Sequence, residues 1–216
     1  MKLSVISLTF AAGGMAAVLK ERSSKAFCQS YTDTYDDLSS NPLLPTTEVG
    51  TYHGLTYSAF VVDEPLVGTS GIVPTSSPNV AAATMQQDEL QLGSLSLNPF
   101  GTIATASGTK AFDLRSFYFA YQLSYKGCVV DDKNTAVTVS SGCTIAVTGY
   151  YATGQQAPEV TFAFAPTSLT EATLVLAELP ATYTLLKNVT FGIADGAVVT
   201  AETVLDIDNV VHCNYL

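Results

Sequence analysis

The sequence predicts an all-β protein, an antiparallel β-sandwich of the jelly-roll type with eight or nine strands and two disulfides. Short apolar runs recur at fairly even spacing after residue 50, and residues that favour turns separate them. No stretch of this part of the chain shows a convincing 3.6-residue apolar period, which argues against helices. The expected strands are residues 52–62, 90–97, 117–125, 136–139, 144–151, 160–164, 173–179, 183–193 and 204–213.

The clearest expected strand is 117–125, where Phe117, Phe119 and Tyr121 alternate with more polar residues. We interpret this aromatic face as core, in preference to a sugar-binding platform, because burial is the usual fate of such a face. Phe112 and Leu114 have the opposite parity, so a bulge is expected near 115–116.

Three segments are expected: a signal peptide at 1–19, an extended polar arm at 20–50, and the sandwich domain at 51–216. Lys2 precedes an apolar run over 3–19 that is rich in small residues and ends before Lys20, as in a secretory signal. A membrane span needs about 20 apolar residues, and this run is shorter and diluted by Ser, Thr and Gly. We therefore expect a secreted, extracellular protein with no membrane attachment after cleavage.

The charge pattern argues against nucleic acid and anionic lipid as partners. Charged residues make up 13% of the chain and the net charge is −10. The five cations beyond residue 25 are scattered singly, so no basic stripe is available to follow phosphates.

Four cysteines suit an oxidising compartment and two disulfides, for which three pairings are possible. Spacing favours Cys128–Cys143, because a loop of about 15 residues gains roughly 3 kcal/mol from the crosslink. Cys28–Cys213 then remains, and it would tie the start of the mature chain to the last strand. A zinc site is disfavoured because the cysteines are not clustered.

Asn188-Val189-Thr190 is the one glycosylation sequon, and strand alternation places Asn188 outward. N-glycosylation at Asn188 is therefore expected, with an unmodified surface asparagine as the alternative.

The last strand, 204–213, is apolar but contains two carboxylates. Alternation places Asp206, Asp208 and His212 on one face, opposite Leu205, Ile207, Val211 and Cys213. The two acids suggest a structural calcium site, and a solvated outer face explains them equally well. Asn209 would face inward unless a bulge turns it out, and a buried amide without partners costs about 1–3 kcal/mol.

No catalytic residue is predicted. The chain has no Gly-X-Ser-X-Gly elbow, and its two histidines, His53 and His212, are expected to be ordinary hydrogen-bonding residues. Glycoside hydrolysis needs two facing carboxyls, and spacing pairs none of the strand-embedded acids Asp113, Glu178, Asp206 and Asp208.

Four blocks together resemble a group of uncharacterised secreted proteins, largely fungal, with a galactose-binding-like or carbohydrate-module-like jelly roll. The blocks are the residues at 52–60, 76–81, 112–119 and 205–210. The resemblance implies that Asp206 or Asp208 helps to hold calcium near the N-terminal strand. Such proteins often have Trp in the first block, where this chain has Tyr57 and no Trp anywhere.

These observations lead to a secreted, non-catalytic protein that binds glycan or cell-wall polysaccharide and requires no cofactor beyond the structural calcium. The alternative is a secreted effector or structural protein that binds another protein. A polysaccharide-active enzyme is the third candidate.

Overall fold

The computed structural model describes residues 27–39, 47–65, 71–84, 100–125, 137–140, 142–169, 171–194 and 203–216. These residues form an all-β structure, as predicted. None of them forms a helix that is long and apolar enough to cross a bilayer. The predicted signal peptide at 1–19 and the expected strand at 90–97 lie outside the described residues.

Fourteen strands are found in the described part of the chain, more than the eight or nine predicted. In order they are β1 (Gln29–Asp33), β2 (Glu48–Tyr52), β3 (Leu55–Asp63), β4 (Gly71–Val73), β5 (Val80–Thr84), β6 (Gly101–Thr105), β7 (Ala111–Tyr125), β8 (Val137–Ser140), β9 (Cys143–Tyr151), β10 (Val160–Phe164), β11 (Glu171–Thr173), β12 (Val175–Glu178), β13 (Leu186–Ile193) and β14 (Thr203–Tyr215).

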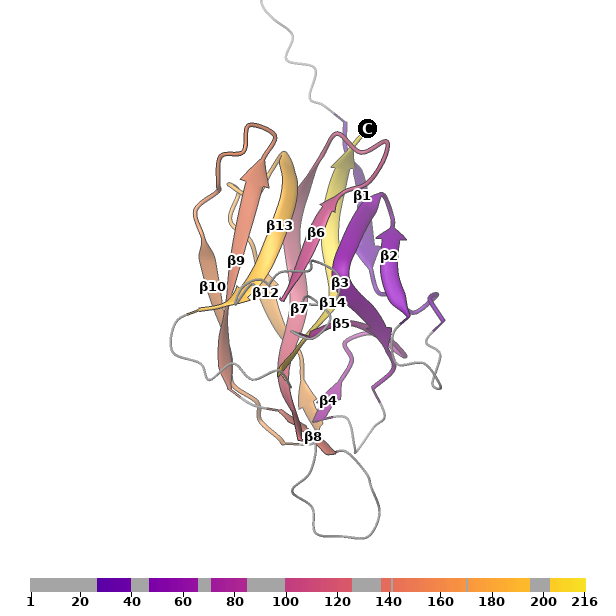
Figure 1. Ribbon diagram of the computed structural model, residues 1–216, viewed down its shortest axis with the longest axis vertical. Helices are drawn as coiled ribbons and strands as arrows, with labels where there is room; N and C mark the ends of the chain where they lie inside the picture. Colours follow the sequence, from indigo (N-terminus) through magenta and orange to yellow (C-terminus); the bar gives the residue numbers. More distant parts are fainter. Residues whose placement is uncertain are drawn as a thin grey trace, which may run out of the picture.

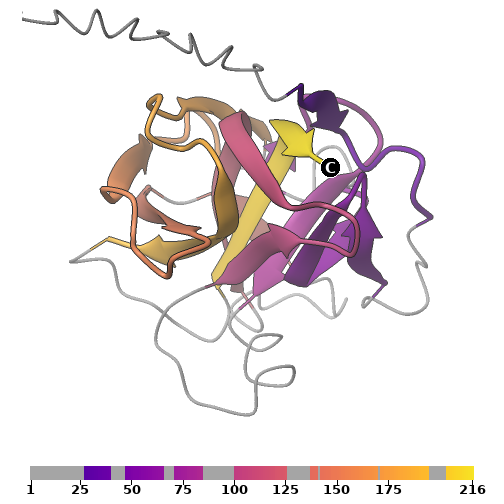
Figure 2. The ribbon, with the colours of Figure 1, turned by 90° about the horizontal axis from the view of Figure 1, so that it is seen from above.

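Twelve of these strands belong to one sheet, and six of them close into a ring of pairings rather than two facing sheets. The ring runs β13-β6-β3-β5-β14-β7, and it closes because β13 also pairs with β7. Every pairing is antiparallel except that of β11 with β4. The predicted jelly-roll sandwich is therefore corrected to a closed six-stranded ring with additional strands. Figures 1 and 2 show β9 and β10 on one side of the molecule and β1 to β3 on the other.

The core fills the ring with aromatic and aliphatic side chains. Phe117 and Phe119 are fully buried, as the alternation predicts, and Phe117 contacts the ring of Phe191 edge-on. Phe112 and Leu114 are buried as well. The predicted bulge near 115–116 is confirmed, because the register between β7 and β14 skips a residue there.

The expected polar arm contains a strand of the sheet. β1 pairs antiparallel with β14 from Gln29↔Asn214 to Asp33↔Val210. The disulfide Cys28–Cys213 is present, with a Cα–Cα distance of 5.4 Å, as predicted. β1 and the C-terminal end of β14 lie together in Figure 1.

The second predicted disulfide is wrong. Cys143 is a free, buried cysteine at the start of β9, and Cys128 lies outside the described residues. Strand alternation turns the Cys143 side chain inward with Ile145 and Val147, so it forms part of the core. Burial raises the pKa of the Cys143 thiol to about 11, which keeps it protonated and unreactive.

Candidate functional site

A polar groove lies on the outer face of β9 and β13. Its volume is about 300 Å³. The side chains that line it alternate along β9 with the core residues, so strand geometry directs them outward. The lining residues are Ala146, Thr148, Tyr150, Gln156, Ala157, Glu159, Thr190 and Gly192.

The polar groups of the groove contact one another at long distances. Gln156 Nε2 donates to the Tyr150 hydroxyl at 3.2 Å, and Thr148 Oγ1 donates to Glu159 Oε2 at 3.3 Å. Thr190 Oγ1 reaches the Thr148 carbonyl at 3.5 Å. Hydrogen bonds of this length are weak, so these groups can exchange them for bonds to a ligand.

Asn188, the predicted glycosylation residue, lies on the same face as the groove. It is half-buried and pairs across the strands with Tyr150. Its Oδ1 atom is buried without a hydrogen-bond partner. The predicted outward orientation agrees with this position, and glycosylation itself stays a prediction.

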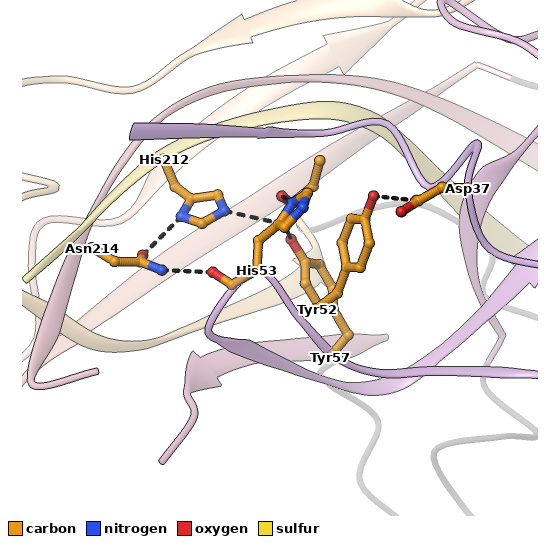
Figure 3. Close-up of polar contacts among 7 residues, drawn as sticks. Asp37, Tyr52, His53, Tyr57, His212 and Asn214 are labelled. Atoms are coloured by element: carbon orange, nitrogen blue, oxygen red, sulfur yellow. Dashed lines mark hydrogen bonds and ion pairs between the residues drawn. The ribbon is translucent and has the colours of Figure 1, made fainter. Parts of the chain in front are cut away.

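A second polar site joins the two histidines around one carboxylate, a proximity that no sequence motif indicated. We call Asp33, His53, Tyr57, His212 and Asn214 the Asp33 cluster; they come from β1, the β2–β3 turn, β3 and β14. Figure 3 shows both histidine rings in this cluster, and Asn214 beside His212. Asp33 belongs to the polar stretch that we expected to be an arm.

Asp33 is completely buried and accepts three side-chain hydrogen bonds. His53 Nδ1 lies 2.7 Å from its Oδ1, His212 Nε2 lies 3.1 Å from its Oδ2, and the Tyr57 hydroxyl donates to the same Oδ2. Burial and the nearby acid raise the pKa of Tyr57 well above its ordinary value, so its hydroxyl remains a donor. Both oxygens of the carboxylate are thereby hydrogen-bonded.

His212 lies between the Asn214 amide and the Asp33 carboxylate. Asn214 Nδ2 donates to the His53 carbonyl at 2.7 Å, which directs Asn214 Oδ1 toward His212 Nδ1 at 2.8 Å. The other ring nitrogen of His212 faces Asp33 Oδ2. Both ring nitrogens of His212 thus lie within hydrogen-bond distance of side-chain oxygens.

His53 is the accessible member of the Asp33 cluster. Its side chain is 37% exposed, and its ring lies between Tyr31, stacked at 5.0 Å, and Tyr52 at 4.1 Å. Tyr31 also stacks on His212 at 5.3 Å. Both histidines are in hydrogen-bond contact with Asp33, which confirms the prediction that they are hydrogen-bonding residues.

The turn that carries His53 requires a glycine next to it. His53 and Gly54 both have positive φ angles, 43° and 79°, in the two-residue connection between β2 and β3. A Cβ atom on Gly54 would lie 2.9 Å from Asn214 Nδ2 and from Thr109 Oγ1. The turn is therefore packed directly against the C-terminal strand.

The two acids of β14 are both completely buried, so the predicted solvated outer face is wrong. Asp208 lies beneath the segment that follows β4. Its Oδ2 accepts from the Thr75 and Ser76 amides at 2.9 and 2.8 Å, and its Oδ1 from Ser76 Oγ and the Asn209 amide at 3.0 and 2.7 Å. Burial raises the pKa of Asp208, and these hydrogen bonds oppose the rise.

Asp206 has far fewer partners. Its Oδ2 accepts from Gln122 Nε2 at 2.6 Å, and its Oδ1 has no hydrogen-bond partner. Burial raises the pKa of Asp206 well above its ordinary value, the charge of Asp63 raises it further, and the Gln122 hydrogen bond opposes both.

Asn209 lies in a bulge and is half-buried, and its Oδ1 atom is buried without a hydrogen-bond partner. Its φ is 48° and the register of β14 against β7 shifts between Asp208 and Val211. The bulge reverses the parity of the strand, so Val210 joins the core in place of the predicted Val211. His212 is buried for the same reason.

The remaining predicted acids lie apart from these sites. Asp113 accepts from the Leu185 amide at 2.9 Å and from the Tyr215 hydroxyl at 3.0 Å, and Glu178 is exposed on β12. No group of three or more His, Cys, Asp or Glu side chains suited to a metal ion occurs among the described residues. The calcium prediction for Asp206 and Asp208 stays a prediction.

Comparison with known proteins does not assign the chain to a family. No family model and no curated protein matches the sequence. Among solved structures, the chain is similar to a DUF4465 family protein from Bacteroides caccae, with a TM-score of 0.46 and 10% identity over 86% of each chain.

Sequence reasoning missed the groove and the contribution of β1. Alternation along 144–151 did contain a signal for the groove, because the inward positions there are apolar and the outward ones include Thr148 and Tyr150. No local signal connects Asp33 to two histidines that are 20 and 179 positions away.

Proposed function

We propose that this protein is a secreted, non-catalytic binding protein that holds a glycan in the groove on β9 and β13. The observation that carries the proposal is the combination of side chains in the groove. Hydroxyl, amide and carboxylate groups lie beside the ring of Tyr150.

Sugars present hydroxyl groups that both donate and accept, next to apolar C–H faces. Gln156 offers both amide functions, Glu159 accepts, and the threonine hydroxyls do either. An aromatic ring such as that of Tyr150 packs against the C–H face of a sugar. The Cys28–Cys213 disulfide supports export, because such bonds persist in oxidising compartments.

A hydrolytic function is not proposed for the groove. Glycoside hydrolysis uses a pair of facing carboxyl groups, and Glu159 is the one carboxylate among the residues that line it. The groove is suited to binding.

A glycan array with the disulfide-bonded protein tests the proposal. Binding should fall about tenfold or more with Tyr150→Ala and with Glu159→Gln, because hydrogen bonds to a charged group are worth about 1.5–3 kcal/mol. Glu178→Gln is the matched control, since Glu178 is also an exposed glutamate but lies on β12, outside the groove. No signal on any arrayed glycan, or equal loss with the control, would contradict the proposal.

Binding of another protein is the second candidate, and it rests on a different surface. Val175 and Leu176 are 38% and 43% exposed on β12, which lies at one end of the strand order. An edge strand with exposed apolar side chains is a place where an extended segment of a partner can pair. Leu176→Glu would impair such pairing and leave glycan binding unchanged.

A further inference from the structure

Glu159 is the single charged residue among the described residues that line the groove on β9 and β13. The other lining residues have hydroxyl, amide or aliphatic side chains, or none in Gly192, so no cation offsets this charge inside the groove. Glu159 is exposed, and its Oε2 accepts one long hydrogen bond, 3.3 Å from Thr148 Oγ1. A carboxylate can accept about four hydrogen bonds, so most of this capacity remains for a ligand or for solvent.

The charge of Glu159 is not offset from outside the groove by an ion pair. In the described part of the chain, the ion pairs within 4.0 Å are those of His53 and His212 with Asp33. Lys187 belongs to β13, but it does not line the groove. The chain has a net charge of −10, so its overall field attracts cationic ligands and repels anionic ones.

Glu159 also lies close to the aromatic side of the groove. Thr148 and Tyr150 are two positions apart on β9, so their side chains share one face and are roughly 6–7 Å apart. Glu159 contacts Thr148, and Gln156 Nε2 donates to the Tyr150 hydroxyl at 3.2 Å. A sugar that packs against the Tyr150 ring would therefore have the Glu159 carboxylate beside its ring substituents.

We propose that the groove selects glycans with free amino groups, in which a protonated amine contacts Glu159; this inference rests on the function proposed above. A protonated amine offers three donors and no acceptor, and a carboxylate accepts only. Hydrogen bonds between ionised partners are shorter and stronger than those between neutral groups. A neutral sugar binds through its hydroxyls without this attraction, and an acidic sugar is repelled because it brings a second negative charge beside Glu159.

Isothermal titration calorimetry of the disulfide-bonded protein tests this selectivity. The ligands are oligomers of equal length and β-1,4 linkage, built from glucosamine, N-acetylglucosamine, glucose or glucuronic acid. In slightly acidic buffer of low salt, where the sugar amine is protonated, the glucosamine oligomer should bind about fivefold more tightly than the two neutral ones, as expected for an exposed ion pair. The glucuronic acid oligomer should bind most weakly, and added NaCl should reduce these differences.

Two matched variants assign the selectivity to the groove. Glu159→Gln should bring the affinity ratio of glucosamine to glucose oligomers to about one, since the ion pair is lost. Glu178→Gln removes the same charge from β12, outside the groove, and should leave the ratio at its wild-type value. Circular dichroism shows that both variants are folded.

The outcomes separate this inference from the function on which it rests. Equal affinity of the wild-type protein for amino and neutral oligomers, or a preference that persists in Glu159→Gln, would overturn the inference and leave glycan binding in place. Absence of binding by all four oligomers would overturn both.

Discussion

Asp33 and Asp206 are both completely buried carboxylates, but they differ in the number of hydrogen bonds that they accept. Asp33 accepts hydrogen bonds from two histidines and a tyrosine, whereas Asp206 accepts one from an amide and leaves an oxygen unpartnered. Both oxygens of the first carboxylate are hydrogen-bonded within the protein. Two equally buried carboxylates can therefore differ widely in how many hydrogen bonds they accept.

The largest expected effect is that of Asp33→Asn. The amide loses the charge that faces His212, and its NH2 group meets the donors of His53 or Tyr57. A buried donor that loses its acceptor costs about 1–3 kcal/mol, and three side-chain contacts of Asp33 are affected here. Urea unfolding measures this free energy, and Asp37→Asn, in an exposed residue that accepts one hydrogen bond from Tyr52, is the control. A loss below about 1 kcal/mol would show that the cluster contributes little.

An intermediate effect is expected from removal of the Cys28–Cys213 disulfide by the double change Cys28→Ala and Cys213→Ala. The bond closes a separation of 185 residues and holds β1, which carries Asp33, against β14. The expected loss of stability is about 2–5 kcal/mol.

Hydrogen exchange tests whether the two acids lie in parts of the fold that open separately. In the double variant, amides of β1 and of its partner residues 210–214 should exchange faster, while those of β5 beside Asp206 should keep their wild-type rates relative to global unfolding. Equal acceleration in both regions would mean that the two carboxylates are not in separable parts of the fold.

The smallest effect is expected from Asp206→Asn. Burial already disfavours the charged form of Asp206 and raises its pKa, so replacing the carboxyl group by a neutral amide should change the free energy of unfolding by less than about 1 kcal/mol or increase it. Chemical denaturation measures it beside Asp33→Asn. A loss of unfolding free energy as large as that of Asp33→Asn would show that the number of accepted hydrogen bonds does not determine how much each buried acid stabilises the fold.

The sequence predicted those features that depend on local alternation. The all-β class, the inward faces of 117–121 and the bulge near 115–116 all follow from the parity of neighbouring residues. Closure of the ring by pairing of Leu186 with Phe112 does not, because it depends on contacts 74 positions apart (186 − 112). The strand at 29–33 was missed because polar residues without apolar alternation resemble a loop.

The site was predicted less well, for a related reason. Parity correctly placed Asp206 and Asp208 on one face, but their burial depends on partners distant in sequence. Thr75 and Ser76 cover Asp208 from 133 and 132 positions away. Local reasoning had no means to tell a covered face from a solvated one.

The Cys28–Cys213 bond also determines how the domain would respond to mechanical tension. It joins residues at the two ends of the described fold, so a pulling force applied before residue 28 and after residue 213 passes through a covalent bond. The strands between those residues would carry almost none of that load. Under such tension the domain would extend only after reduction of the disulfide, which makes the redox state of its surroundings the determinant of its mechanical resistance.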